Sequence, residues 1–430
     1  MTGTPKIVLF PEASFGAALN CVGIAQALLE LGAMPVFICH QGFTGVFAEY
    51  GFQEYPLPQK TSRQEVSETY WQQFTNTHIP HFNLAPIDQL PTYVAPTWDS
   101  IVDTVEDAEI GLQILIKRIK PDLILLDNVI MFPAIANAEC PWVRVISCAE
   151  TELPDNNVPP YLSGITASSE QRKAFEKAYL KHTSKIHKRY NSLRKSNGIS
   201  QLKPGVFLEP SPYLNLLLAP SIVRYERAAE LDNEQYVFLE GCVRKDSHFS
   251  MPVFPNNTGP LVYVSFGSLG ASDTDLMNRM IATFADIPAR FLINAGGFLD
   301  SYKEIPDNVY LGSWFPQPSV VAQSDLFIHH GGNNSFCEAL YYGIPSLIMP
   351  YCWDGHDNAQ RAEATGVGRY LNRSDWTPEQ LAKEIQGLLV NDSMQKALAD
   401  NAVLMQQQSG TQQAAQSCID AIKRFNGARG

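Results

Sequence analysis

Short apolar runs alternate with helically spaced segments along the first half of the chain. The segments 20–31 and 133–139 repeat apolar residues at helical intervals. Four further runs have the length and composition of buried strands: 7–10, 36–39, 123–126 and 143–148. Strands that alternate with helices form parallel βαβ units, because each helix carries the chain back across the sheet. The first half is therefore predicted to be a doubly wound parallel sheet.

The same alternation returns in the second half, after an irregular stretch. Predicted strands lie at 261–266, 290–294, 308–311, 325–330 and 346–349, and predicted helices at 274–284, 376–390, 392–409 and 411–425. The irregular stretch contains Pro252, Pro255 and the pair Asn256-Asn257, which favour a linker. The sequence thus predicts four parts: an N-terminal domain (1–241), a linker (242–259), a C-terminal domain (260–410) and a final helix (411–430).

Two segments depart from the alternation. Residues 56–100 are rich in Pro, Thr, Gln and aromatic side chains, which predicts loops and short helices inserted into the first domain. A long irregular insert is often functional, but a plain surface excursion with some buried aromatics explains the composition equally well. Residues 168–197 form a basic helix candidate, for which a solvated face is favoured over an anion-facing role.

Composition and charge narrow the class of protein. The chain has 430 residues, of which 45% are apolar and 18% charged, so more than one globular core is expected. Its formal net charge of −12 disfavours nucleic acid and anionic membranes as partners, because phosphates are repelled at long range. A local anion site remains compatible with this charge, since backbone amides at a helix start can build one.

The eight cysteines are scattered and form no Cys-x-x-Cys pair, which is typical of buried thiols in a reducing compartment. The N-terminus has no signal-peptide pattern, and no run of eighteen apolar residues predicts a membrane span. A cytoplasmic protein without a transmembrane segment is therefore expected.

The strand predicted at 325–330 leads into a turn of small residues that has the character of an anion site. Gly331 and Gly332 let a phosphate approach the backbone, and the helix predicted from about residue 336 has unpaired amides at its positive end. Asn334 and Ser335 can cap this helix or donate to phosphate oxygens. His330, at the carboxyl end of the strand, adds a donor where ligands of open parallel sheets bind.

Four further side chains complete the pattern of a nucleotide-sugar site. Trp314 and Gln317 precede the turn, and Glu338 and Asp354 follow it. An aromatic face stacks on a nucleobase, an amide reads its edge, one carboxylate takes the ribose hydroxyls and another takes the sugar.

Taken together, these residues resemble the signature of the UDP-glycosyltransferase superfamily, the family 1 glycosyltransferases of GT-B fold. Their spacing is that of the bacterial macrolide and antibiotic enzymes. The matching elements are Trp314-Phe315-Pro316-Gln317, His330-Gly331-Gly332, Asn334-Ser335 with Glu338, Gly343 with Pro345, Pro350, and Asp354 with Asn358-Ala359. The segment 265–268 resembles the phosphate-side loop of the family, which places Ser268 among the donor-binding residues.

The resemblance implies two facing Rossmann-like domains, with the acceptor in the first, the donor in the second and the last helix crossing back. It implies an inverting glycosyltransferase that needs no metal or other cofactor. The substrates would be a UDP- or dTDP-sugar and a small hydrophobic or aromatic acceptor, either a natural product or a lipid. The oligomeric state stays open.

The first loop departs from the family pattern. The position of the catalytic histidine is occupied by Ala17, and that of a following proline by Asn20. Alanine accepts no proton, whereas general-base help is worth typically about 10²–10⁴-fold. Asp127, at the end of a strand, is then the candidate base, with a helix-capping or turn role as its alternative. The remaining candidates for the acceptor side are Glu12, Trp71, Phe82 and Glu150, while His40 is expected to be structural.

A second departure concerns the donor sugar. The family commonly has Gln after the sugar-binding Asp, and here Gly355 follows Asp354. The missing amide is expected to remove a donor and to leave room, which argues against a plain preference for glucose.

Two other readings stay open. The loss of the histidine favours a donor-binding relative that acts as the partner of another enzyme. A nucleotide-sugar epimerase of the same overall fold is the third possibility, although the Trp314–Gln317 element and Asp354 fit a transferase better. The sequence leaves the acceptor, the sugar, the nucleobase and the linkage atom undetermined.

Overall fold

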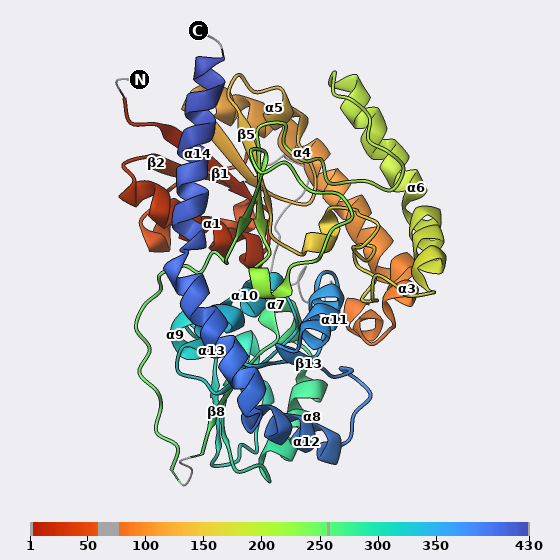
Figure 1. Cartoon of the computed structure of the whole chain (residues 1–430), viewed down its shortest axis with the longest axis vertical. Helices are drawn as coiled ribbons and strands as arrows, with labels where there is room; N and C mark the ends of the chain where they lie inside the picture. Colours follow the sequence, from red (N-terminus) through yellow and green to blue (C-terminus); the bar gives the residue numbers. More distant parts are fainter. Residues whose placement is uncertain (1–2, 59–76, 256–258, 429–430) are drawn as a thin grey trace.

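Two parallel sheets, each covered by helices on both faces, make up the molecule. The computed structural model describes residues 3–58, 77–255 and 259–428. Figure 1 shows the N-terminal lobe above the C-terminal lobe, with the blue C-terminal helices running along both. The prediction of two doubly wound α/β domains is confirmed.

The N-terminal sheet has seven strands in the order β3-β2-β1-β4-β5-β6-β7. All neighbouring strands are parallel. The strands are β1 (Lys6–Pro11), β2 (Met34–Cys39), β3 (Gln53–Pro56), β4 (Leu123–Asp127), β5 (Trp142–Ile146), β6 (Leu214–Leu218) and β7 (Tyr236–Leu239). The central strands are mostly apolar because helices bury both of their faces.

The C-terminal sheet has six parallel strands in the order β10-β9-β8-β11-β12-β13. They are β8 (Leu261–Ser265), β9 (Arg290–Asn294), β10 (Val309–Gly312), β11 (Leu326–His329), β12 (Ser346–Ile348) and β13 (Gly368–Tyr370). The strand order reverses beside β8 and β11, which is where doubly wound sheets bind ligands.

The helices of the N-terminal lobe are α1 (Phe15–Glu30), α3 (Pro86–Gln89), α4 (Ala95–Ile119), α5 (Pro133–Ala136) and α6 (Arg172–Ser196), with single 3-10 or π turns between them. The C-terminal lobe contributes α7 (Gly267–Gly270), α8 (Thr274–Phe284), α9 (Gln317–Val321), α10 (Asn333–Tyr342), α11 (Gly355–Thr365), α12 (Pro378–Leu389), α13 (Asp392–Gln407) and α14 (Gly410–Gly427).

Several element boundaries differ from those predicted. Helix α1 begins five residues earlier than expected, at Phe15, because Ser14 caps it through a bond from the amide of Ala17. Helix α4 begins at Ala95, so the end of the segment predicted as an irregular insert is helical. Helix α10 begins at Asn333 rather than near residue 336.

The N-terminal lobe and the last helix share a core. Ala414, Ala415 and Cys418 of α14 are buried in one cluster with residues of α1 such as Cys21. Between β7 and β8 the described chain has no regular secondary structure, in keeping with the linker expected there. Figure 1 shows α14 lying beside α1 at the top of the molecule.

Candidate active site

The carboxyl ends of the two sheets face each other, and the predicted site residues gather there. Asp127 ends β4, and Glu12 follows β1, whose Pro11 lies opposite Asp127 in the parallel register. The amide of Glu12 donates to the carbonyl of Asp127 at 2.7 Å. His330 follows β11 in the other sheet, directly before the glycine turn. Strand-end side chains from both lobes therefore meet at the junction of the lobes.

The glycine turn before α10 is held open by two histidines. Nδ1 of His329 accepts from the amide of Gly331 at 3.1 Å, and Nδ1 of His330 accepts from the amide of Gly332 at 3.3 Å. Gly331 has φ +88°, and an added Cβ would lie 2.6 Å from the carbonyl oxygen of Gly355. Only glycine fits this position without displacing the backbone.

The side chain of His330 is neutral at ordinary pH. Burial and the nearby charge of Arg373 lower the pKa of its imidazole to about 4. Because Nδ1 is used as an acceptor, the proton resides on Nε2, which leaves an N–H donor. This nitrogen lies 3.0 Å from the position that a Cβ on Gly267 would take, so His330 and α7 enclose the same small space.

Asp354 binds the start of α10 from the neighbouring element. Its Oδ2 accepts from the amide of Asn333 at 2.9 Å and from Nδ2 of Asn358 at 3.2 Å. Gly332 is the N-cap and supplies no side chain, so Asn334 and Ser335 lie inside the first turn and do not cap it. A carboxylate thus already occupies part of the positive helix end, next to the predicted phosphate position.

Gln317, Ser335 and Glu338 form one hydrogen-bonded network. Nε2 of Gln317 donates to Oγ of Ser335 at 3.0 Å and to Oε2 of Glu338 at 2.7 Å, and Asn334 donates to the other Glu338 oxygen at 3.3 Å. Glu338 also makes a buried 2.9 Å ion pair with Arg244. The sequence pattern missed Arg244, because it lies in the expected linker, far from the donor motif.

Two more residues were predicted to bind the donor, Trp314 and Ser268. Trp314 follows β10 and is 60% exposed, which leaves an indole face accessible to a ligand. Ser268 lies within α7. The roles predicted for both residues stay predictions.

A buried arginine lies behind the donor side. Arg373 is 3% exposed, stacks over the rings of Phe266 and Tyr351 and pairs with Asp273. Its Nε and Nη1 have no hydrogen-bond partner within the described residues. Since Tyr351 in turn packs on His330 with ring centroids 4.9 Å apart, the positive charge lies close to the glycine turn.

On the acceptor side, Asp127 is held from two directions. Its Oδ1 accepts from Oγ of Ser147 at 2.6 Å, and Sγ of Cys21 lies 3.9 Å from Oδ2. Ala17 is buried one helical turn before Cys21, on the same face of α1. The position that the family gives to its histidine therefore lies close to Asp127.

Glu12, Asp127, Glu152 and Asp354 are four carboxyl groups that surround Cys148. All four raise the pKa of its thiol, together with burial. Burial raises the pKa of Glu12 and Asp354 to about 7 and that of Asp127 and Glu152 to about 8. Mutual repulsion adds to the shift, so the cluster holds protons at neutral pH.

The structure shows the surroundings of two further residues predicted for the acceptor side, Glu150 and Phe82. Glu150 pairs with Arg227 at 3.1 Å and accepts from the amide of Tyr225 at 2.9 Å. Phe82 is 1% exposed and packs on Tyr351 with ring centroids 4.9 Å apart. Trp71 lies outside the described residues. Contact of these side chains with an acceptor stays a prediction.

The expectation that Gly355 leaves room beside the donor sugar is wrong. A Cβ on Gly355 would lie 2.5 Å from the carbonyl oxygen of His330. The space that a larger side chain would need is filled by the backbone of the His330–Gly331 turn. Glycine is required here because α11 and the glycine turn approach each other closely.

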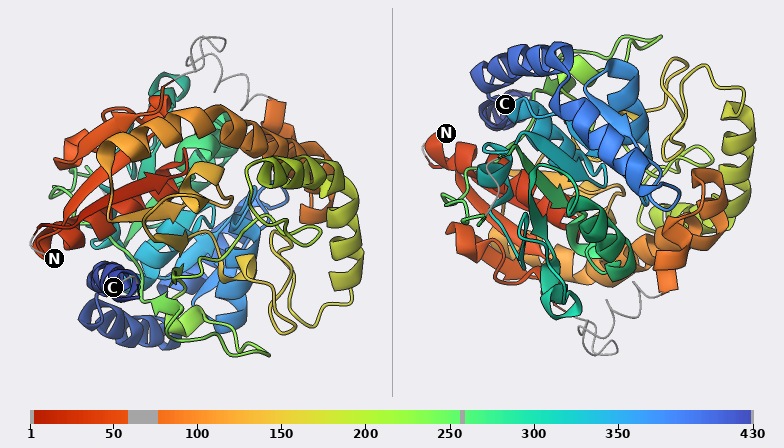
Figure 2. Two further views of the ribbon diagram at one scale, coloured as in Figure 1. Left: turned by 90° about the horizontal axis from the view of Figure 1, so that it is seen from above. Right: turned by 90° about the horizontal axis from the view of Figure 1, so that it is seen from below.

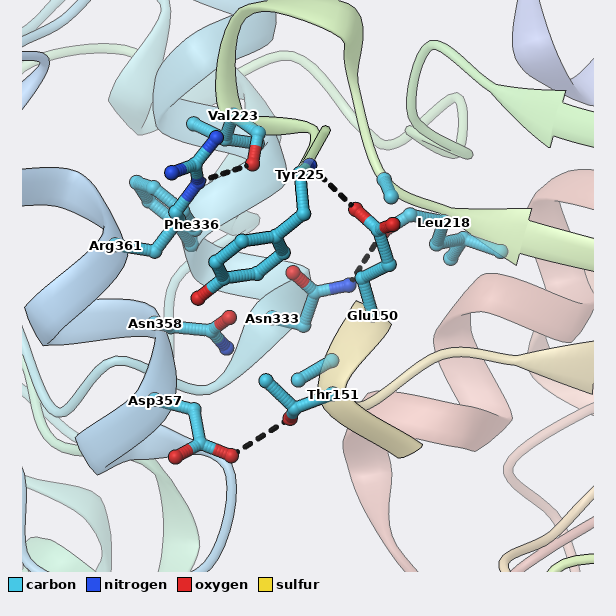
Figure 3. Close-up of a pocket in the computed structure, with 12 residues that line it drawn as sticks. Glu150, Thr151, Leu218, Val223, Tyr225, Asn333, Phe336, Asp357, Asn358 and Arg361 are labelled. Atoms are coloured by element: carbon cyan, nitrogen blue, oxygen red, sulfur yellow. Dashed lines mark hydrogen bonds between the residues drawn. The ribbon is translucent and has the colours of Figure 1, made fainter. Parts of the chain in front are cut away.

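Direct contacts join the two lobes beside the cluster of buried carboxyl groups (Figure 3). Asp357 accepts from Oγ1 of Thr151 at 2.7 Å, and Nδ2 of Asn333 donates to the carbonyl oxygens of Ser147 and Leu218 at 2.8 and 2.9 Å. The cavity among these side chains is about 20 Å³ in volume, which suits a water molecule and no larger ligand.

A larger cavity of about 300 Å³ lies within the N-terminal lobe. Its wall is mainly aromatic and proline-rich, with Glu152 and Thr151 on the side toward the carboxyl cluster. Helix α6, which forms much of the outer wall, lies at the edge of the molecule away from both termini (Figure 2).

Within the described ranges, no three His, Cys, Asp or Glu side chains are grouped so that they could hold a metal ion. Over those same ranges, every helix is too short or too polar to cross a bilayer.

Two facing doubly wound domains, with a glycine turn and helix start at their junction, define the GT-B class. The segment 278–421 matches the family described as "Erythromycin biosynthesis protein CIII-like, C-terminal domain". The chain is 26% identical over 230 residues to the oleandomycin glycosyltransferase of Streptomyces antibioticus, covering 53% of each chain. It is 27% identical over 176 residues to the demethyllactenocin mycarosyltransferase of Streptomyces fradiae, covering 40% of this chain and 38% of that one.

The matched segments span about half or less of the length of these curated relatives. Solved structures extend the likeness to nearly the whole chain. The glycosyltransferase of kitacinnamycin superposes with a TM-score of 0.72 at 19% identity, covering 99% of both chains. The glycosyltransferase VinC in complex with dTDP superposes with a TM-score of 0.65 at 16% identity, covering 97% of this chain and 100% of that one. The GT-B fold and the resemblance to antibiotic-type family 1 glycosyltransferases are confirmed.

Proposed function

We propose that this chain is an inverting glycosyltransferase that moves a sugar from a UDP- or dTDP-sugar to a small hydrophobic or aromatic acceptor. The observation that carries the proposal is the start of α10. There the glycine turn, the neutral His330 and the first turn of the helix lie together, facing the carboxyl groups of the other lobe. The glycosyltransferase VinC, which resembles this chain in fold, was solved in complex with dTDP, and this supports a nucleoside diphosphate as the leaving part of the donor.

In this proposal the nucleoside lies between Trp314 and the Gln317–Glu338 network. The exposed indole of Trp314 stacks on the base, and Glu338 takes the ribose hydroxyls. Arg244 favours the ionised form of Glu338 and opposes burial, which raises the pKa of this carboxyl above its ordinary value. Ser335, held by Gln317, then lies one turn from the diphosphate.

The diphosphate acquires charge as its bond to the sugar breaks. In this proposal Nε2–H of His330 and first-turn amides of α10 beyond Asn333 bind that charge, and Arg373 adds a positive potential from behind. Asp354, bound to the amide of Asn333, then holds the sugar hydroxyls. The chemistry requires no metal in this arrangement, because backbone and side-chain donors bind the leaving group.

The test is an assay of donor consumption with and without acceptor. UDP- and dTDP-sugars are first tested for binding by calorimetry and then incubated with a panel of hydroxylated aromatic acceptors. A transferase releases nucleoside diphosphate only together with glycosylated acceptor. A partner protein binds the donor and releases nothing, and an epimerase converts the donor without an acceptor. Either of the last two results contradicts the proposal.

A further inference from the structure

The 300 Å³ cavity in the N-terminal lobe has the lining of a site for a flat aromatic molecule. Five aromatic side chains form its wall: Trp98, Tyr161, Phe175, Tyr179 and Phe207. Trp98 and Phe207 stack in parallel with ring centroids 4.1 Å apart. The volume lies at the lower end of the range for small-molecule pockets, about 300–1,000 Å³.

The residues that line this cavity all belong to the N-terminal lobe, and one side chain of the C-terminal lobe packs on two of its aromatic residues. Trp353 packs on Trp98 and Tyr161, with centroids 5.3 and 6.2 Å apart. Its backbone has φ +54°, a left-handed conformation that is costly for a tryptophan and that directs the next residue, Asp354, toward the glycine turn. The charge of Asp354 acts on Glu152, which lines the cavity, so a molecule in the cavity would lie near the residue proposed to hold the donor sugar.

Glu152 connects the cavity to the carboxyl cluster. It lines the cavity, and its Oε2 accepts from the amides of Cys148 and Ala149 at 3.2 and 3.4 Å. Its Oε1 has no hydrogen bond to any described residue. The hydroxyl of Tyr161, on the same wall, is buried beside the Cys148 thiol and makes no hydrogen bond within the described part of the chain.

Asp127, the base expected from the sequence, is placed differently. It is 2% exposed, its Oδ1 is engaged by Ser147, and it is not among the residues that line the cavity. Its negative charge acts on Glu152 through space. The geometry therefore gives Asp127 a supporting position and Glu152 the direct one.

We propose that this cavity is the acceptor site for an uncharged, hydroxylated aromatic molecule and that Glu152 takes the proton of the attacking hydroxyl group. The inference rests on the glycosyltransferase function proposed above. The acceptor oxygen forms a bond to the anomeric carbon as the carbon–oxygen bond to the diphosphate breaks. The hydroxyl proton passes to Oε1 of Glu152, and the bonding electron pair leaves with the nucleoside diphosphate.

The charge of the lining sets the acceptor class. Glu152 and Glu176 are the acidic residues of the wall, and Arg172 is engaged by Glu176 at 3.0 Å. An anionic acceptor would be repelled by Glu152 in the ionised form that accepts the proton, and it would find Arg172 already paired. An aromatic alcohol or phenol without a carboxylate fits both the apolar wall and the proton acceptor.

The test compares Glu152→Gln with Asp127→Asn, using an aromatic primary alcohol that does not ionise between pH 5.5 and 9. For the native protein, kcat/KM is expected to rise with pH through about 8, the pKa to which burial raises Glu152, because only the carboxylate accepts a proton. Glu152→Gln is expected to lower transfer by about 10²-fold or more and to abolish the rise. Asp127→Asn should keep the rise and move it to lower pH, because a repelling charge is removed.

Two further variants separate chemistry from folding. Glu152→Asp keeps a carboxyl group in a retracted position, so a slower reaction with the rise intact is expected. Glu176→Gln makes the same chemical change at a half-exposed carboxyl of the same cavity and should preserve the pH-dependent rise. Calorimetric binding of the nucleotide reports whether each variant keeps its donor site.

The outcomes are distinct. If Glu152→Gln retains both rate and rise while Asp127→Asn loses them, Asp127 is the base and the assignment is overturned. If the native protein binds the donor but transfers to none of the uncharged aromatic alcohols or phenols, the acceptor class is overturned. If no nucleotide sugar binds, the proposed function itself fails.

Discussion

The role proposed for Trp314, stacking on the nucleobase, needs only its own exposed indole ring. It is 60% exposed and offers an indole face in the absence of ligand. Stacking on an aromatic side chain is worth about 1–3 kcal/mol per base. Trp314→Ala should therefore weaken nucleotide binding about tenfold or more in calorimetry, and Trp314→Phe should retain much of the affinity. Equal affinities for the alanine variant and the native protein would remove Trp314 from the site.

His330 should act on every donor alike. In the proposed mechanism its neutral imidazole donates through Nε2 to the oxygens that carry the leaving charge, which are the same whatever sugar is attached. Loss of one such donor costs about 10²–10³-fold in turnover. His330→Ala should show this loss with each accepted donor, and His330→Gln should recover part of it. A loss that varies strongly with the sugar would assign His330 to sugar recognition instead.

The sequence predicted the donor-side residues because each belongs to a short, spaced motif. It could not predict Arg244 or Glu152, since neither lies in a motif and both reach the site only through packing between distant segments. Gly355 shows why matching a family motif position by position can mislead. The absence of a side chain suggested free space, but in the structure the backbone of His330 occupies that space.

At the scale of elements, the turn before α10 and the start of α11 approach each other closely at two glycines, Gly331 and Gly355. A Cβ on Gly355 would lie 2.5 Å from the carbonyl oxygen of His330, which is backbone and cannot rotate away. Gly355→Ala should therefore lower the free energy of unfolding by about 1–3 kcal/mol, as expected for overpacking, and should weaken nucleotide binding.

Gly387 offers a matched control. It lies in α12, and a Cβ there would meet nothing within 4 Å. Gly387→Ala should stabilise the protein by about 0.4–1 kcal/mol, because alanine is the better helix former. Urea denaturation measures both variants. A neutral effect of Gly355→Ala would show that the turn can move aside.

Element prediction succeeded for an amphipathic helix and for a buried strand. The segments 274–284 and 290–294 were predicted with the bounds that α8 and β9 have. The start of α10 was predicted three residues late, because Gly332 caps it without a polar side chain and leaves no signal in the sequence. Among the strands, β6 was not predicted, although Leu214–Leu218 is apolar except for Asn215, because this polar residue interrupts the run.

At the scale of the whole molecule, the junction of the lobes concentrates buried carboxyl groups. Burial raises the pKa values of Glu12 and Asp354 to about 7 and of Asp127 and Glu152 to about 8. The folded chain therefore keeps protons that the unfolded chain loses near pH 4. Stability from these groups is fully present below that pH and is lost as pH rises through 7 to 8.

The histidines with pKa values lowered to about 4, His40, His330 and His356, act in the opposite direction, but only below their ordinary pKa near 6.5. Between pH 6.5 and 8.5 the carboxyl groups dominate. The free energy of unfolding in urea should fall across this window, and Asp127→Asn should flatten the fall. A stability that rises over the window would contradict the shared burial of these groups.

The sequence predicted both domains and their order, since each is built from local βα units. It could not predict how the lobes meet, because Asn333, Asp357 and Asn358 bind backbone and side chains some 100 to 200 positions away. Such contacts depend on the folded arrangement of both lobes. The 300 Å³ cavity lies within the N-terminal lobe, and its lining residues come from segments between residues 98 and 208, so no one segment of the sequence carries its pattern.

The most direct test of the central claim is proton NMR of one reaction containing donor and aromatic acceptor, followed over time. The account predicts that the anomeric signal of the donor sugar disappears as a signal of the opposite anomeric configuration appears on the acceptor, with one nucleoside diphosphate released per transfer. Free sugar, an epimerised donor or a product that keeps the anomeric configuration of the donor would contradict it.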